Sequence, residues 1–358
     1  MEKRTAFEHG FIHHNPNSFF RYDGWPSVCK DDEGTLYAAY SGFRARHICP
    51  FGKTCLCKST DGGTTWSAPI VVNDTWLDDR DAGVICLGGK KIMVTWFTHP
   101  IDLYLGKLKN HIVNDWPGSV SVLEQYPNIP EDQNRGGSFV RVSEDGGATW
   151  GDIIQLPVSA PHGPIVRRDG SLLYLGKEMW AHDESTPDVI IAMESRDDGK
   201  TWTELGRVPL PDEEGIIWNH LHEPHVVELP DGKLIGMIRQ ERSFGTIYQT
   251  ESTDGGRTWT NPVPLGVHGL PPHIIEHSSG ALIMVFGRRE VPFGERAVVS
   301  HDGGRTWPDE YILRDDAPSG DLGYPATVEL ADGSLLTVYY QIAQGDSFPS
   351  IQYTKWTL

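Results

Sequence analysis

Short apolar runs occur in pairs along this chain, and a polar turn joins the two runs of each pair. The segment that begins at Pro272, PHIIEHSSGALIMVFG, is an example, in which two apolar runs flank a turn containing Gly280. Two such runs separated by a Gly-containing turn are typical of a β-hairpin. The pattern predicts six hairpins in all, and the other five begin at Pro26, Asp81, Pro164, Pro224 and Pro325.

An eight-residue pattern, Ser-x-Asp-(Gly/Asp)-Gly-x-Thr-Trp, follows five of these hairpins, and we call each copy an aspartate turn. Its aspartate can accept hydrogen bonds from backbone N–H groups of the same turn, and its glycine can adopt a positive φ angle. The tryptophan supplies a large apolar side chain for packing. A pattern that recurs about every 50 residues indicates an array of similar structural units. The aspartates are Asp61, Asp145, Asp197, Asp254 and Asp302.

Six hairpins with five aspartate turns predict an all-β fold, a six-bladed β-propeller, because a four-stranded blade needs roughly 40 to 50 residues. We expect residues 1–358 to form this single domain. No aspartate turn follows the sixth hairpin, so a strand from residues 5–22 should complete the last blade and close the ring. Residues 101–136 lack strand alternation. We predict that they form an insert within the second blade, which holds most of the helix and lies at the rim of the pocket.

Composition narrows the possible partners. The net charge is −18, which argues against nucleic acid or an anionic membrane as a partner. No apolar run resembles a signal peptide or a membrane-spanning helix, and the five cysteines are odd in number, so we expect free thiols and a cytoplasmic location. Cys49, Cys55 and Cys57 lie near His47 but lack the spacing of a zinc site. We expect neither a metal ion nor another cofactor.

Polar and aromatic residues precede the first apolar run of several hairpins. In a propeller the inner strands start around one end of the central channel, so these residues should converge on one pocket. They are Trp25, Arg80, Asp81, His162, His222, Glu223 and Tyr324. The ends of the second strands add Arg44, Arg46, His47, Glu178, Arg239, Arg288 and Arg289. So many cationic and hydrogen-bonding groups at one end predict a site for a polar, anionic ligand.

With these residues and repeats, the chain resembles the sialidase (neuraminidase) superfamily, whose six-bladed propellers carry such turns, known as Asp boxes. The resemblance extends over nearly the whole chain. Within EPHVVELPDGKLIGMIR, Glu223 and Arg239 match the catalytic glutamate of the family and one arginine of its carboxylate-binding triad. Within GYPATVELADGSLLTVYY, Tyr324 matches the tyrosine nucleophile that the glutamate activates. The resemblance implies another arginine of the triad after the fifth hairpin, where Arg288, Arg289 and Arg296 are candidates, and we favour Arg288 or Arg289.

Glu223 and Tyr324 occupy equivalent positions in their hairpins, directly before Pro224 and Pro325. The pseudo-symmetry of the blades should therefore aim both side chains at the channel, and we predict a hydrogen bond between them. A phenol suits a sialoside as the nucleophile, because the carboxylate on the anomeric carbon would repel a second carboxylate. We expect neighbouring arginines to lower the pKa of this phenol.

Two positions depart from the sialidase pattern. Residues 24–26 are Gly-Trp-Pro where these enzymes have Arg-Ile-Pro, so the first arginine of the triad is absent, and Arg21 could substitute only by a different route. The loop SGFRARHICPFGK contains no carboxylate where the resemblance requires the general acid, which leaves His47 or Asp81 for that role. We therefore expect weak or no activity on ordinary sialosides.

Three functions are compatible with these residues. The leading hypothesis is an exo-acting glycoside hydrolase that acts on a terminal, acidic sugar of an oligosaccharide or glycoside. A second is a polysaccharide or oligosaccharide lyase acting on uronates, in which His162 or His222, Tyr324 and Arg239 would supply the base, the proton donor and the cation that neutralises the carboxylate. A third is a non-catalytic carbohydrate-binding propeller, which would lack a close pair of tyrosine and glutamate.

Overall fold

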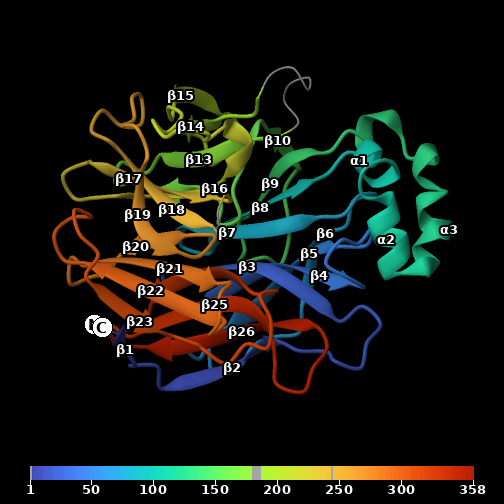
Figure 1. Ribbon diagram of the computed structural model, residues 1–358, viewed down its shortest axis with the longest axis horizontal. Helices are drawn as coiled ribbons and strands as arrows, with labels where there is room; N and C mark the ends of the chain where they lie inside the picture. Colours follow the sequence, from blue (N-terminus) through green and yellow to red (C-terminus); the bar gives the residue numbers. More distant parts are fainter. Residues whose placement is uncertain (1, 180–186, 243–244) are drawn as a thin grey trace.

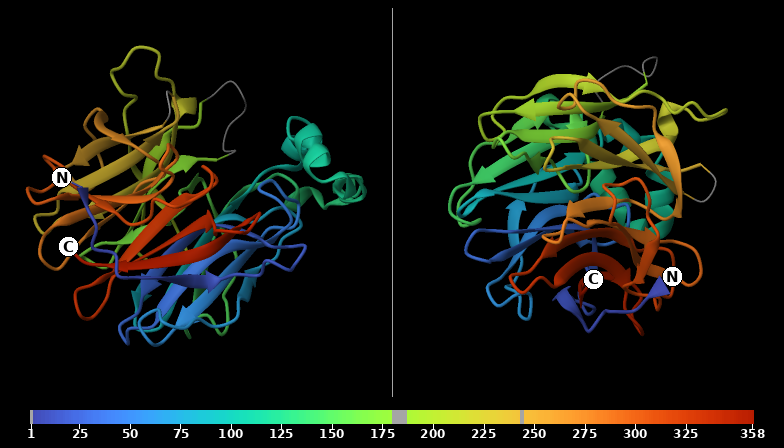
Figure 2. Two further views of the ribbon diagram at one scale, coloured as in Figure 1. Left: turned by 60° about the horizontal axis from the view of Figure 1, so that its bottom comes forward. Right: turned by 90° about the vertical axis from the view of Figure 1, so that its left-hand side faces the viewer.

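Six β-sheets surround a central axis in the computed structural model, which describes residues 2–179, 187–242 and 245–358 (Figure 1). The fold is a six-bladed β-propeller, as the hairpin pattern predicted. Each blade follows the chain from an inner strand at the axis toward an outer strand. Figure 2 shows the sheets from two further directions, with a helical segment that extends from one side of the propeller.

The first three blades follow the order of the chain, except that the third has two short strands beside β13. Blade 1 comprises β3 (Tyr22–Lys30), β4 (Leu36–Arg44), β5 (Lys53–Ser59) and β6 (Ile70–Asn73). Blade 2 comprises β7 (Arg80–Gly88), β8 (Lys91–Thr98), β9 (Gly137–Ser143) and β10 (Ile154–Leu156). Blade 3 comprises β11 (Val158–Ser159), β12 (Ile165–Val166), β13 (Leu172–Glu178), β14 (Ile190–Ser195) and β15 (Thr203–Arg207).

The ring closes through a strand from near the N-terminus, because β2 (Glu8–His13) pairs with β26 in blade 6. This pairing confirms the strand that was expected from residues 5–22. Blade 4 comprises β16 (Leu221–Glu228), β17 (Leu234–Gln240), β18 (Thr246–Ser252) and β19 (Val263–His268). Blade 5 comprises β20 (His273–Glu276), β21 (Leu282–Arg288), β22 (Gly294–Ser300) and β23 (Asp309–Ile312), with β1 (Glu2–Lys3) beside β23. Blade 6 is completed by β24 (Gly323–Glu329), β25 (Leu335–Ile342) and β26 (Pro349–Trp356).

Most of the helix lies between β8 and β9, in residues 101–133. The α-helices are α1 (Ile101–Leu105), α2 (Lys109–Asp115) and α3 (Val120–Leu123). The 3-10 turns are η1 (Pro117–Ser119), η2 (Tyr126–Asn128), η3 (Glu131–Gln133) and, in blade 4, η4 (Trp218–His220). Buried Leu77, Tyr104, Ile112 and Tyr126 form a small core that holds the insert to the propeller. Within the described ranges, no helix has the length and apolar character needed to cross a bilayer.

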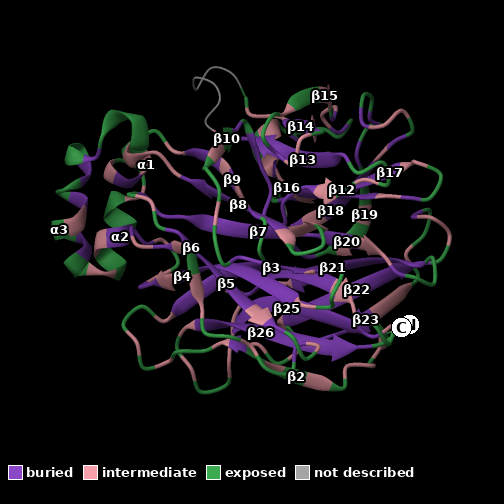
Figure 3. Cartoon of the chain, turned by 180° about the vertical axis from the view of Figure 1, so that it is seen from behind, coloured by how far each residue is buried: buried purple, intermediate pink, exposed green. Residues whose placement is uncertain are grey.

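Neighbouring blades pack through apolar side chains, and Figure 3 shows that most of the strand residues are buried. At the closure of the ring, Leu36 and Tyr40 of blade 1 belong to the same buried cluster as Val338 and Tyr340 of blade 6. Burial of apolar side chains stabilises the fold at roughly 25 cal/mol per Å² removed from water. The ring is therefore closed by packing as well as by the pairing of β2 with β26.

Each aspartate turn joins the third and fourth strands of its blade by the same hydrogen bonds. In blade 4, Asp254 Oδ1 accepts from the Ser252 hydroxyl (2.9 Å) and from the backbone N–H groups of Arg257 (3.0 Å) and Thr258 (2.9 Å). Its Oδ2 accepts from the Thr258 hydroxyl at 2.6 Å. One carboxylate thus satisfies several donors of a tight turn. The same serine and threonine contacts occur at Asp61, Asp145, Asp197 and Asp302.

We expect Asp254→Ala to lower the melting temperature by roughly 1–4 °C, because the variant leaves the N–H groups of the turn without their acceptor. Calorimetry measures this change, and Asp212→Ala in the exposed loop before β16 is the control. Because the turn lies between outer strands, ligand binding at the axis should not change. A variant that loses ligand binding while keeping its melting temperature would contradict this structural role.

Candidate active site

Four inner strands carry a non-glycine residue with a positive φ angle at the same place in their blades. Trp25, Asp81, Glu223 and Tyr324 have φ angles of 54°, 52°, 47° and 52°. At each of them, the pairing with the second strand shifts its register. This left-handed conformation is unfavourable for such side chains, and it is concentrated at functional sites in proteins. The four blades use it to turn different side chains toward one place.

Glu223, Tyr324 and Arg239 are in direct contact there, and the predicted hydrogen bond is present. The Tyr324 hydroxyl donates to Glu223 Oε1, and Arg239 Nη1 donates to Glu223 Oε2. The same Nη1 lies 3.2 Å from the phenol oxygen of Tyr324, and Arg239 Nη2 donates to Glu241 Oε1 at 2.5 Å. The glutamate thus holds a phenol on one oxygen and a guanidinium on the other.

The protonation states of this pair follow from burial and charge. Burial alone would raise the pKa of Glu223, but the charge of Arg239 and the hydrogen bonds from Tyr324 and Arg239 outweigh it and hold this pKa below its usual value. Burial, with the charges of Glu223 and Asp81, raises the pKa of Tyr324 well above its usual value. Neighbouring arginines act on this pKa in the expected direction, but its net shift is upward. Arg239 and Arg289 do lower it, but burial and the two carboxylates act more strongly.

Asp81 is the second carboxyl group of the site. It is buried, and Oδ1 has no hydrogen-bond partner among the described residues. Burial and the charge of Glu223 raise the pKa of Asp81 to about 7, against the opposing charges of Arg80, Arg44 and Arg239. Glu223 is therefore ionised at neutral pH while a large fraction of Asp81 is protonated. Two carboxyl groups with separated pKa values are the usual arrangement of an acid and a base.

A cavity of about 440 Å³ gives access to both carboxyl groups. Asp81 and Glu223 line it together with His222, Lys177 and Lys107. Lys107 belongs to the helical insert, so the insert lies at the same end of the propeller as Glu223. This volume is within the range of pockets that bind small molecules. No three His, Cys, Asp or Glu side chains in the described part of the chain are grouped to hold a metal ion.

Lys177 was not predicted, although its neighbour Glu178 was. The Lys177 ammonium donates to the carbonyl oxygens of Leu221 (2.8 Å) and Trp218 (3.1 Å) and lies 3.2 Å from His222 Nδ1. Glu178 is buried instead and accepts from the backbone N–H of Val189 at 3.1 Å. A lysine within the apolar run SLLYLGKE was the available signal. Alternation along β13 aims Lys177 at the cavity, where burial lowers its pKa to about 8.

Trp25, at the position of the missing arginine, is buried beneath two other arginines. The guanidinium carbons of Arg80 and Arg44 lie 4.1 and 4.6 Å from the centroid of its ring. Asp78 binds both guanidinium groups, with contacts of 2.8 Å to Arg44 Nη2 and 3.2 Å to Arg80 Nη1. The structure thus places Arg44 in a buried ion network behind the site. Tyr104 of the insert joins the network by donating to Asp78 Oδ2 at 3.2 Å.

His47 belongs to a polar network on the other side of Trp25. Its Nδ1 lies 2.6 Å from the Tyr22 hydroxyl and 3.3 Å from Asp321 Oδ1. Tyr340 donates to the same carboxylate oxygen at 3.2 Å. The His47 side chain is 47% exposed, so it can meet a ligand. Asp321, three residues before Tyr324, was not assigned a role in the site from the sequence.

The two candidate arginines at the end of β21, Arg288 and Arg289, have different surroundings. The Arg289 guanidinium carbon lies 5.9 Å from the centroid of the Tyr324 ring, and Arg289 donates to the Leu322 carbonyl at 3.0 and 3.1 Å. The charge of Arg288 acts on Arg296, and no contact of Arg288 with Tyr324 or Glu223 is found among the described residues. Arg289 is therefore the better candidate to bind a ligand beside Arg239.

Three further predicted residues lie away from Glu223. Arg21 and Arg46 both lie over the Phe348 ring, at 4.6 and 5.0 Å from its centroid. Arg21 donates to the Pro16 carbonyl at 3.0 Å, and so it does not take the place of the missing arginine. His162 lies deeper along the axis, beside two other histidines, and lines a different cavity. The cluster at the site therefore contains Glu223, Tyr324, Arg239, Asp81, Arg80, Arg289, His222 and Trp25.

Comparison with solved structures finds the same fold. A protein of unknown function from Dyadobacter fermentans superposes with a TM-score of 0.78 at 21% identity, over 99% of this chain and 98% of that one. The intramolecular trans-sialidase from Ruminococcus gnavus superposes with a TM-score of 0.68 at 17% identity, over 97% of both chains. The NanB sialidase from Streptococcus pneumoniae superposes with a TM-score of 0.70 at 16% identity, over 98% of this chain and 70% of that one. No curated protein matches the sequence.

The six blades define this protein as a sialidase-like β-propeller. The chain belongs to the BNR repeat-like domain family, whose sequence profile matches residues 102–337. The resemblance drawn from the repeats and from the Glu223 and Tyr324 segments is thereby confirmed at the level of the family and the fold.

The Asp81 carboxyl group should titrate near pH 7, and Glu223→Gln should lower its pKa, because the variant removes a negative charge that raises it. Carbon-13 NMR of labelled aspartate side chains measures both values. Glu228→Gln, at the far end of the same strand, is the matched control and should leave the titration of Asp81 unchanged. A wild-type Asp81 that titrates near pH 4 would contradict this description of the site.

Proposed function

We propose that this protein is an exo-acting glycoside hydrolase that acts on a terminal, acidic sugar of an oligosaccharide or glycoside. The observation that carries the proposal is the contact of the Tyr324 phenol with an ionised Glu223 that Arg239 also holds. A nucleophile in contact with its base, and a base oriented by a third group, is the arrangement of covalent catalysis. The Ruminococcus gnavus trans-sialidase, which has this fold, is in complex with oseltamivir carboxylate.

In the proposed first step, Tyr324 Oη attacks the anomeric carbon and its proton passes to Glu223 Oε1. The bond to the leaving oxygen breaks, and this oxygen takes a proton from Asp81. In the second step, Asp81 takes a proton from water, and the water oxygen replaces the phenol at the anomeric carbon. Tyr324 recovers its proton from Glu223, so the enzyme ends in its starting state. The raised pKa of Tyr324 means that the phenol stays protonated until attack.

Asp81 is a better general acid than His47 on this geometry. Asp81 lines the cavity with Glu223 and has a pKa of about 7, so it can hold a proton at neutral pH and release it. His47 is separated from Tyr324 by Trp25, whose ring centroid lies 5.0 Å from the His47 ring and 6.3 Å from the Tyr324 ring. We assign Asp81 the proton transfer and His47 a contact at the edge of the site.

Arg239 and Arg289 support the binding of an anionic group next to the anomeric carbon. Both guanidinium groups lie beside Tyr324, and a guanidinium suits a carboxylate in geometry and charge. Trp25 stands where a sialidase has the first arginine of its triad. The carboxylate of the bound sugar therefore has fewer cationic partners than in a sialidase with a complete arginine triad. We propose an acidic sugar other than the common sialic acids as the preferred substrate.

The alternative lyase reaction would use a histidine as the base, and the two candidates are poorly placed for it. His222 Nε2 lies 2.7 Å from the Asn219 carbonyl, and Nδ1 lies 3.2 Å from the Lys177 ammonium. Both nitrogens are thereby engaged, which supports hydrolysis over elimination. His162 lines another cavity and does not reach the Glu223 cavity. The close pair of Tyr324 and Glu223 likewise favours an enzyme over a binding module.

A panel of 4-nitrophenyl glycosides of acidic and neutral sugars tests the proposal. We expect one acidic glycoside to be hydrolysed and the sialoside to react weakly, and Tyr324→Phe should reduce kcat by roughly 10³-fold or more. Product binding should change by less than about threefold, because the phenol ring is retained. Tyr311→Phe in β23 is the matched control. Undiminished activity of Tyr324→Phe, or an unsaturated product that absorbs in the ultraviolet, would reject this mechanism.

The pH profile and the leaving group test Asp81. Activity needs ionised Glu223 and protonated Asp81, so kcat/KM should decline about tenfold per pH unit above about 7 and also decline at low pH, where Glu223 gains a proton. Asp81→Asn should remove the alkaline limb. The Asp81→Asn variant should slow the hydrolysis of alkyl glycosides far more than that of 4-nitrophenyl glycosides, because a good leaving group needs little protonation. The same selectivity in His47→Asn instead would assign the acid to His47.

A further inference from the structure

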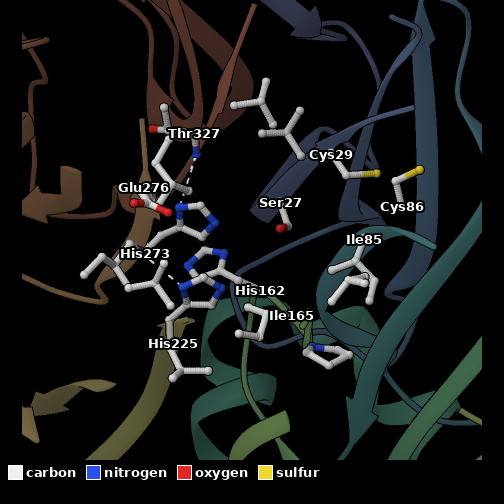
Figure 4. Close-up of a pocket in the computed structure, with 18 of the residues that line it drawn as sticks. Ser27, Cys29, Ile85, Cys86, His162, Ile165, His225, His273, Glu276 and Thr327 are labelled. Atoms are coloured by element: carbon white, nitrogen blue, oxygen red, sulfur yellow. Dashed lines mark hydrogen bonds between the residues drawn. The ribbon is translucent and has the colours of Figure 1, made fainter. Parts of the chain in front are cut away.

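A second cavity, of about 540 Å³, is enclosed by the inner strands of the blades at the propeller axis. Figure 4 shows residues that line it. It shares no lining residue with the cavity of Glu223. The inner strands begin beside the active site and end at Lys30, Glu228, Glu276 and Glu329, and these last residues line the second cavity. Nothing in the proposed hydrolysis uses this cavity.

Three buried histidines from three consecutive blades form one wall of this axial cavity. The ring centroids of His225 and His273 lie 4.3 Å apart in a stacked arrangement, and His162 lies 4.9 Å from His273 and 5.7 Å from His225. Figure 4 shows the rings side by side, facing Ser27 and Ile85 across the cavity. Each of the three is at most 6% exposed.

The backbone fixes which nitrogen carries the hydrogen in two of these rings. The N–H of Ile274 donates to His225 Nδ1 at 3.1 Å, and the N–H of Thr327 donates to His273 Nδ1 at 3.3 Å. A ring nitrogen that accepts a hydrogen bond carries no hydrogen, so in the neutral ring the hydrogen is on Nε2. Burial lowers the pKa of His225 to about 3 and that of His273 well below its usual value, so both rings are neutral. Each therefore keeps an Nε2–H group as a donor.

This tautomer argues against a metal ion, because a metal ligand needs a nitrogen without hydrogen and Nδ1 is already engaged. His162 adds further unused hydrogen-bonding capacity. It is 1% exposed, and neither of its ring nitrogens has a hydrogen-bond partner among the described residues. A polar group that is buried in this way is stabilised when a partner binds it.

The remaining wall is mostly apolar, and charge is confined to the mouth. Two ion pairs lie there, in which Arg168 binds Glu276 at 2.7 Å and Arg167 binds Glu228 at 3.3 Å. A mainly apolar wall with a few placed donors is the usual form of a small-molecule site. Apolar residues that line the cavity include Val28, Val84, Ile85, Ile165, Val226 and Val328.

We propose that the axial cavity binds an uncharged small molecule that has an apolar body and a carbonyl group, with the carbonyl oxygen accepting from the histidine N–H groups. The burial that keeps the rings neutral also disfavours a charged head group beside them. The site is independent of the active site, because the two cavities have no residue in common.

Cyclohexanone is a suitable probe, with cyclohexylamine and cyclohexanecarboxylate as cationic and anionic probes of the same shape. Nitrogen-15 NMR of the histidine side chains, recorded while each probe is added, reports contact with the rings. We expect saturable shifts of the three axial histidines with cyclohexanone, with a Kd in the millimolar range for so small a ligand. Neither charged probe should bind as tightly.

His162→Phe removes both ring nitrogens while keeping a flat ring, and it should weaken cyclohexanone binding about fivefold or more. His301→Phe, on an exposed histidine of blade 5, is the matched control. Arg289→Met, at the active site, should not change binding. The proposal is overturned by absent or unsaturable shifts in the wild type, by tighter binding of a charged probe, or by loss of binding in Arg289→Met alone. The wild-type titration decides the question if His162→Phe does not fold.

Discussion

The left-handed backbone at the start of four inner strands is the constraint on which the active site depends. Without it, alternation along a regular strand would direct Glu223 and Tyr324 into the packing between blades, since neighbouring side chains point to opposite faces. Trp25 keeps the same conformation, although it carries no reacting group. The strain of one such residue is of order 1–3 kcal/mol, and the paired sheets around it must hold it in place. The propeller therefore acts as a rigid frame for side chains in an unfavourable conformation.

Trp25 also explains how the site can lose an arginine without losing its structure. The indole fills the space below the catalytic pair, and Arg80 and Arg44 cover its face. Asp78 pairs with both guanidinium groups, and a buried charged network is stable only when every member has a partner. Tyr104 links the insert to this network through Asp78. The insert, the first blade and the second blade are thus coupled beneath the substrate position.

Repeats made the fold predictable, because six similar hairpins and five similar turns give the same signal many times. The contact between Glu223 and Tyr324 was also predictable, since equivalent positions in repeated units point to the same axis. The choice between Arg288 and Arg289 could not be predicted from the sequence. The strand β21 ends at Arg288, so alternation no longer fixes the direction of these side chains, which depends on the following loop. The pKa of Tyr324 depends on burial, which is a property of the assembled blades. Lys177 was missed for a similar reason, since it differs from Glu178 only in the face of β13 that it occupies.

Burial near the axis has opposite effects on the pKa values of acids and bases, and this governs the protonation states in both cavities. It raises the pKa of Asp81 to about 7 and lowers the pKa of His225 to about 3, so each group tends toward its uncharged form. Glu223 is also largely buried but keeps its charge, because Arg239 lies against it. Direct hydrogen bonds from Arg239 and Tyr324 thus distinguish the base from the acid among two neighbouring carboxyl groups. Farther along the axis no cation contacts the histidine rings in the described structure, and the rings remain neutral donors.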